Sequence, residues 1–194
     1  MQNQFTTFNH FRGESTEEIQ NQVGEKIQGL SIKQPVRLPQ EIVKIIHDRI
    51  GGEYHAHYAY RAAANWCKNV NYKKAAAFFE KGAEEELEHA KDLQDYLTQW
   101  NILPDIPSVN PHFQFQNLIQ IIEEIYDVEC KLLLDYSKNA ISVLDNHTAT
   151  FNFFQKYIDI QNQAVAEISD LLNALCLINV QNKLDLLIFE ERYF

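Results

Sequence analysis

The residues best able to do chemistry in this sequence are polar groups that interrupt apolar helical stripes. A helix that faces a core repeats its apolar residues at alternating spacings of three and four. Four long segments carry such a stripe, and each stripe is apolar at both ends and polar in the middle. The middle positions, in chain order, are Glu53, Glu86 with His89, Glu129 and Gln161.

Three carboxylates in one core need a compensating cation. A buried carboxylate either takes up a proton or binds a positive charge, and no Lys or Arg lies in the middle of these stripes. Glu86 and His89 form Glu-x-x-His, the spacing that carboxylate-bridged di-metal bundles use. Carboxylate oxygen with imidazole nitrogen suits iron or manganese, with zinc as another occupant. Glu-x-x-His alone is common on solvated helices, so the predicted metal pair depends on the glutamates and the glutamine of the other stripes.

Helices must bring these residues to one depth. The periodicity predicts them over about residues 39–67, 72–100, 113–143 and 148–175, with a short fifth helix over 184–194. The polar positions then lie about 20 Å along each helix at 1.5 Å per residue. The second connection, NILPDIPSVNPH, is the longest, and the first and third are short. We therefore expect an all-α four-helix bundle of two antiparallel hairpins, with a long crossover between helices two and three.

Composition narrows the partners. The chain has 194 residues and a formal charge of −10, from 27 acidic and 17 basic side chains, which argues against nucleic-acid or anionic-membrane binding. Its three cysteines form no CxxC, so neither a disulfide framework nor a cysteine metal site is expected, and a reducing cytoplasm fits. The first residues have no apolar signal region, and no stretch reaches the length of a membrane span.

Residues 1–38 are predicted to be an N-terminal extension, and residues 39–194 the main domain. Ser15 and Glu18 form a capping box, followed by apolar residues at helical spacing up to Leu30. A short amphipathic helix is expected there, and the segment SIKQPVR then forms a linker.

The sequence resembles bacterial non-haem ferritins, of the ferritin-like di-iron family, over about residues 38–192. KKAAAFFEKGAEEELEHAKDLQDYLTQWNILPDI is similar to their second helix and the turn after it. EEIYDVE resembles their third helix, and TATFNFFQKYIDIQ resembles the start of their fourth. The resemblance implies a ferritin-like bundle and a ferroxidase that oxidises Fe(II) with dioxygen or peroxide. It also implies storage of the ferric product in a homo-oligomeric cage of about 24 chains.

The resemblance also implies a role for each site residue, with two irons per subunit. Glu53 binds the first iron, Glu86 bridges both, His89 completes the first site, Glu129 binds the second, and Gln161 lies beside the second iron and the dioxygen. Tyr60 is then the nearby redox-active tyrosine, and it is also an ordinary core aromatic. No haem is expected, because Met1 is the only methionine.

The fourth helix departs from the family at the third iron site, and the role of His57 stays open. A third iron site of the bacterial type needs carboxylates on the fourth helix, where this chain has Ile160, Gln163 and Ala164, so two irons are expected. His57 is either a hydrogen-bonded core histidine or a group in contact with the iron site.

Other functions are carried as alternatives. One is a different carboxylate-bridged di-iron or di-manganese oxidase or peroxidase on the same bundle. Those enzymes typically show two Glu-x-x-His motifs, whereas no histidine follows Gln161 at that spacing. Another is a non-catalytic cage subunit, against which the full ligand set argues.

Overall fold

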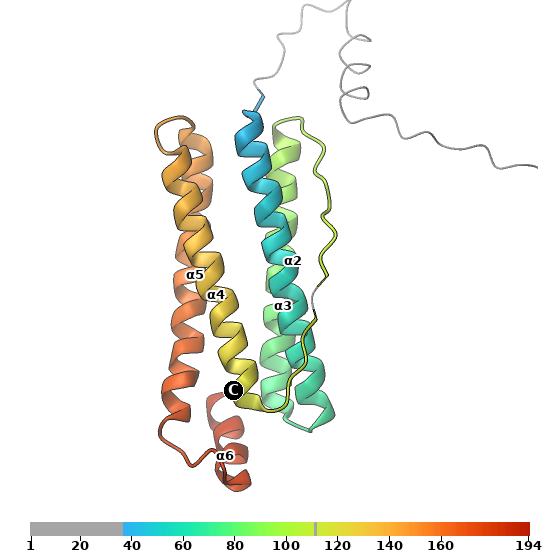
Figure 1. Ribbon diagram of the computed structural model, residues 1–194, viewed down its shortest axis with the longest axis vertical. Coiled ribbons are helices and arrows are strands. Elements are labelled where there is room, and N and C mark those ends of the chain that lie inside the picture. Colours follow the sequence, from blue (N-terminus) through green and yellow to red (C-terminus); the bar gives the residue numbers. More distant parts are fainter. Residues whose placement is uncertain (1–36, 111) are drawn as a thin grey trace, which may run out of the picture. The chain divides into compact units, whose positions relative to one another are not determined.

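The computed structural model describes residues 37–110 and 112–194, so the predicted extension and its short helix lie outside the described residues except for Arg37 and Leu38. The described part contains five helices and no strand: α2 (Gln40–Asn69), α3 (Lys73–Gln99), α4 (Leu118–Val143), α5 (Thr148–Leu175) and α6 (Lys183–Tyr193). Helices α2 and α3 form one hairpin and α4 and α5 another. The segment between α3 and α4 runs along the bundle to join them (Figure 1). The predicted all-α bundle with a long crossover and a short fifth helix is confirmed.

Two asparagines end the helices of the first hairpin. Asn71 and Asn101 have φ of 68° and 58°, in the left-handed region that asparagine tolerates better than most residues. The backbone N–H that follows each asparagine donates back to the helix, from Tyr72 to Cys67 at 2.9 Å and from Ile102 to Leu97 at 3.1 Å. These bonds satisfy carbonyls that the helix end would otherwise leave open.

Helix α4 begins at Leu118, later than the predicted start near residue 113. The side chain of Asn117 accepts a hydrogen bond from the backbone N–H of Gln120 at 2.9 Å, which makes it the N-cap. Phe113 and Phe115 precede it, and their rings stack with centroids 6.1 Å apart. Side chains two residues apart point to the same side only when the backbone is extended. The segment with Phe113 and Phe115 therefore packs against the core without being helical.

The core divides into two apolar clusters with a polar belt between them. One cluster includes Phe79, Ile122 and Ile168, and the other includes Ile46 and Leu93. The belt consists of Glu53, Glu86, Glu129 and Gln161, each at most 4 % exposed. Burial therefore confirms the predicted stripes, with their apolar ends and polar middles.

Helix α6 docks on the start of α3 and supplies its missing cap. No side chain within α3 or at Tyr72 caps this helix. Glu190, 4 % exposed, accepts hydrogen bonds from the backbone N–H groups of Lys74 at 2.6 Å and Ala75 at 3.1 Å. These are first-turn donors that have no partner within their own helix. A carboxylate there also meets the positive end of the helix dipole.

Loss of this cap is expected to destabilise the bundle. Glu190→Ala removes the acceptor of one buried and one part-buried backbone N–H and should lower the free energy of unfolding by about 1–3 kcal/mol. The control is Glu191→Ala, since Glu191 forms an exposed ion pair with Lys74 and should cost at most about 1 kcal/mol. Urea unfolding of the metal-free protein measures both changes. Equal costs would show that Glu190 is not a structural cap.

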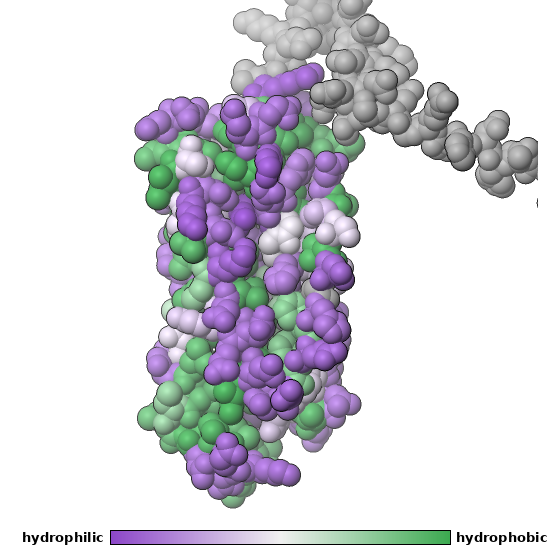
Figure 2. Space-filling view, viewed as in Figure 1, coloured by the Kyte–Doolittle hydropathy of each residue, from purple (hydrophilic) through white to green (hydrophobic). Residues whose placement is uncertain are grey.

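The face of the bundle shown in Figure 2 is mostly hydrophilic, and hydrophobic surface gathers near the lower ends of α5 and α6. Exposed apolar side chains in these elements and their connection are Leu177, Leu184, Leu187, Ile188 and Tyr193. Among the described helices, none is both long and apolar enough to span a membrane.

Candidate metal centre

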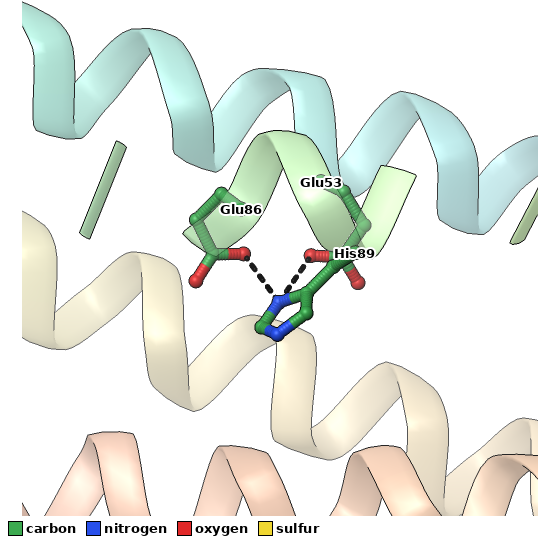
Figure 3. Close-up of side chains that lie close together, drawn as sticks. All are labelled: Glu53, Glu86 and His89. Carbon is green, nitrogen blue, oxygen red and sulfur yellow. Dashed lines mark hydrogen bonds and ion pairs between the residues drawn. The ribbon is translucent and has the colours of Figure 1, made fainter. Parts of the chain in front are cut away.

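Three of the predicted ligands meet in the middle of the bundle. Glu53 comes from α2, and Glu86 and His89 come from successive turns of α3. One ligand atom from each lies within 4.8 Å of the others. The Nδ1 atom of His89 lies 3.3 Å from Oε2 of Glu86 and 3.9 Å from Oε2 of Glu53, so the imidazole stands between the two carboxylates (Figure 3).

Glu129 and Gln161 belong to the same buried belt but stand outside this group of three. Both are 0 % exposed. Within residues 37–110 and 112–194, Oε2 of Glu53, Oε2 of Glu129 and both amide atoms of Gln161 have no hydrogen-bond partner. A buried polar atom without a partner costs free energy, and several in one place are typical of a ligand-binding site. Carboxylate oxygens with an imidazole nitrogen fit a divalent cation such as iron.

A tyrosine holds each of the two outer carboxylates. The hydroxyl of Tyr60 on α2 donates to Oε1 of Glu129 at 2.5 Å. The hydroxyl of Tyr136 on α4 donates to Oε1 of Glu53, the reciprocal contact across the bundle. Both phenols are buried. Each therefore fixes the orientation of one carboxylate and leaves its second oxygen free for a ligand.

Sequence reasoning singled out Tyr60 and missed Tyr136. Tyr136 lies on the third apolar stripe, two turns after Glu129, where an aromatic residue reads as ordinary core. Its ring does stack on Tyr157 with centroids 4.9 Å apart, as a core residue would. The one feature of the sequence that could have indicated its role is a tyrosine hydroxyl on an apolar stripe that also carries the buried Glu129.

One buried cation lies near the centre, but it is already paired. Arg49, 8 % exposed, precedes Glu53 by one turn, off the apolar stripe. Its guanidinium lies 3.0 Å from the carboxylate of Asp135 and 5.8 Å from the ring centroid of Tyr136. Lys131 pairs with the same carboxylate at 2.7 Å. Within the part of the chain that the structure describes, Arg49 forms no ion pair with Glu53, Glu86 or Glu129, so it does not neutralise them directly.

Burial controls the ionisation of the three glutamates. Loss of solvent raises the pKa of Glu86 to about 8, and the nearby charge of Glu129 adds to the effect. Burial likewise raises the pKa of Glu129 to about 7, against the hydrogen bond from Tyr60, which lowers it. The pKa of Glu53 is raised well above its ordinary value by burial and by Glu86. Without a cation, the site therefore holds protons at neutral pH.

The stability of the metal-free protein should consequently fall as pH rises. The unfolded chain releases these protons near pH 4.5, whereas the folded protein keeps them up to about pH 7 to 8. The stabilisation that comes from holding these protons is complete below the unfolded pKa near 4.5. It is lost as the pH rises through the folded pKa values of about 7 to 8. Thermal unfolding between about pH 5 and pH 8.5 should give a declining midpoint. Glu86→Gln, which cannot ionise, should flatten the decline, and a midpoint that rises with pH would contradict this ionisation.

A pocket of about 330 Å³ reaches the centre between α3 and α5. Tyr60, Glu86 and His89 line the pocket from α2 and α3. Ile160, Gln163 and Ala164, the positions where bacterial ferritins would place third-site carboxylates, line it from α5. The pocket also contains two further carboxylates, Glu85 and Glu167. Glu167 lies one turn beyond Gln163 on α5. It is outside the positions that the resemblance to bacterial ferritins pointed to, so it was not singled out from the sequence. Lys81 already pairs with Glu85 at 2.9 Å.

His57 lies outside the group of three ligands. Its Nδ1 atom is 2.6 Å from the carbonyl oxygen of Ala83, to which it donates. This hydrogen bond between α2 and α3 agrees with the structural interpretation of His57.

The structure is a helical bundle built around buried glutamates with a histidine beside them, and comparisons with known proteins agree with this class. A profile of the ferritin-like domain matches residues 43–178. The bacterial non-heme ferritin of Escherichia coli O6:H1 is 28 % identical over 142 residues, which is 72 % of this chain and 86 % of that protein. The bacterial non-heme ferritin of Campylobacter jejuni is 28 % identical over 148 residues, covering 73 % and 86 %.

Solved structures share the fold. An open pore ferritin from Archaeoglobus fulgidus superposes with a TM-score of 0.75 at 21 % identity, over 80 % of this chain and 97 % of that one. The chain belongs to the family of ferritin-like domains.

Proposed function

We propose that this protein is an iron-storage ferritin with ferroxidase activity. The observation that carries the proposal is the group of buried Glu53 and Glu86 with half-buried His89, together with oxygens of Glu129 and Gln161 that have no hydrogen-bond partner among the described residues. In this proposal Fe(II) is both the substrate and the cargo. The relatives named bacterial non-heme ferritin support the assignment to iron.

Two iron positions share Glu86. The first iron is bound by Glu53, Glu86 and His89, and the second by Glu86 and Glu129, with Gln161 beside the second iron and the dioxygen. Glu86 lies in the middle of the belt and is the carboxylate able to neutralise both ions. Tyr60 orients Glu129 and supplies the redox-active phenol next to the second position.

The reaction oxidises two ferrous ions together. Each ion gives up one electron, and dioxygen takes both electrons with two protons to form hydrogen peroxide. The glutamates release protons when Fe(II) binds, because metal ligation requires the carboxylate form. The pocket between α3 and α5 gives ions a path to the site, with Glu85 and Glu167 near it.

Storage requires assembly. We propose a homo-oligomeric cage of about 24 chains in the cytoplasm, in which the ferric product accumulates as mineral. The exposed apolar side chains of α6 then become buried between subunits.

Rapid mixing with Fe(II) in air tests the proposal. The fast phase of oxidation should saturate at about two irons per chain, because Ile160, Gln163 and Ala164 supply no carboxylate for a third iron. Oxygen consumption should match the two-electron reaction, and a ferric core should then grow inside the particle. Saturation at three irons would overturn the stoichiometry. Absence of both a fast phase and a core would overturn the function.

A further inference from the structure

Gly82 occupies a position in α3 where glycine is locally unfavourable. It lies one turn before Glu86 in the middle of the helix, and its φ is not positive. Mid-helix glycine is less favourable than alanine, because the backbone loses more freedom on folding. A glycine kept there calls for a steric reason.

The ring of Tyr60 supplies that reason. A Cβ atom added at Gly82 would lie 2.6 Å from both Cδ1 and Cε1 of Tyr60, and 3.2 Å from Cζ. Carbon atoms in ordinary contact are about 3.5–4.0 Å apart. The ring therefore lies directly against the α3 backbone, in space that every other amino acid would fill.

Tyr60 lines the pocket between α3 and α5, but its hydroxyl and one side of its ring are held by neighbours. It is 5 % exposed, its ring packs near that of Phe79 at 6.2 Å between centroids, and its hydroxyl donates to Glu129 at 2.5 Å. An added Cβ at 2.6 Å is about 1 Å closer than ordinary carbon contact, so it would push the ring away from α3 by about that much. A ring displaced by about 1 Å cannot keep this short hydrogen bond in place.

We propose that Gly82 is a positioning residue that aims Tyr60 at Glu129 and so fixes the second iron position. The inference rests on the proposed function only in assigning Glu129 to that ion. Without the phenol in place, Glu129 loses the donor that orients it, while Glu53, Glu86 and His89 keep their arrangement. Gly82→Ala should therefore weaken the second metal position and spare the first.

Cobalt(II) titration of the metal-free protein, followed by visible absorption and calorimetry, tests this separation. Wild type should bind two ions per chain. Gly82→Ala should bind the first normally and the second about 10–100-fold more weakly, the usual effect of removing a partner of a ligand. Tyr60→Phe should give the same pattern. The matched control is Gly51→Ala, another mid-helix glycine, whose added Cβ meets only Pro107 at an ordinary 3.6 Å and should leave both ions unaffected.

The double variant Gly82→Ala/Tyr60→Phe decides whether Gly82 acts through the phenol. Its second-ion affinity should equal that of Tyr60→Phe alone, because the misplaced hydroxyl is already absent. Additive losses would overturn the proposal, as would binding by Gly82→Ala that matches Gly51→Ala. If Gly82→Ala does not fold, Gly82→Ala/Tyr60→Leu should fold because the ring is gone, and failure of that variant would also overturn the proposal.

A crystal structure of metal-free Gly82→Ala separates this inference from the proposed function. The hydroxyl of Tyr60 should lie more than about 3.5 Å from Glu129, beyond hydrogen-bond reach. Displacement in a protein that does not oxidise iron would leave the positioning intact and reject the ferroxidase. An undisplaced ring would reject the positioning.

Discussion

Glu86→Ala should abolish rapid iron oxidation while leaving the metal-free protein folded. Glu86 is the shared ligand of both proposed iron positions, so its loss weakens both ions at once. Loss of a partner that merely supports a ligand costs about 10–100-fold in metal affinity, and loss of a bridging ligand should exceed that. The initial rate of Fe(II) oxidation should fall by more than about 100-fold.

The stability of metal-free Glu86→Ala should change little, because the substitution removes a buried carboxyl that has no metal to bind in that state. Burial raises the pKa of Glu86 to about 8, so the ionised form of this carboxyl is unfavourable in the metal-free bundle. Removing a buried polar group often offsets the cavity left behind. The matched control is Glu88→Ala, an exposed glutamate two residues along the same helix. It should retain both oxidation and stability. A Glu86→Ala protein that unfolds without metal, or that oxidises iron at the wild-type rate, would contradict this role.

Leu93→Ala should lower the stability of the protein and leave iron oxidation largely intact. Leu93 is 0 % exposed and belongs to the apolar cluster beyond the polar belt. Its truncation leaves a cavity and should cost about 2–5 kcal/mol of the free energy of unfolding. The ligands lie outside that cluster, so oxidation should persist at temperatures where the variant is folded.

The control for Leu93 is Leu87→Ala on the same helix. Leu87 is 43 % exposed, so its truncation should cost less than about 1 kcal/mol. Urea unfolding and initial oxidation rates measure both variants. Loss of oxidation in Leu93→Ala without loss of stability would mean that core and chemistry have been assigned the wrong way round.

The fold and most of the belt follow from periodicity. A carboxylate in the middle of an apolar stripe has to be buried once the helix packs, and this places Glu53, Glu86 and Glu129 at one depth. The starts of α2, α3 and α5 were predicted within one residue of the structure. The start of α4 was not, because Phe113 and Phe115 extend the apolar pattern into a segment that the Asn117 cap keeps out of the helix.

Contacts across the bundle could not be predicted in the same way. Periodicity assigns a residue to a face, but it does not say which side chain it meets on another helix. The hydrogen bond from Tyr136 to Glu53 depends on the relative rotation of α2 and α4. The fit of Tyr60 against Gly82 depends on the spacing of α2 and α3. Both are set by packing of the whole core, so only the folded bundle reveals them.

Anomalous diffraction from crystals soaked in Fe(II) tests the di-iron centre most directly. Data collected above and below the iron absorption edge distinguish iron from other metals. Two iron peaks per chain are expected in the polar belt, one in contact with Glu53, Glu86 and His89 and the other with Glu86 and Glu129. Iron bound only to surface carboxylates, with no peak between α2 and α3 at the depth of Glu86, would contradict the proposed centre.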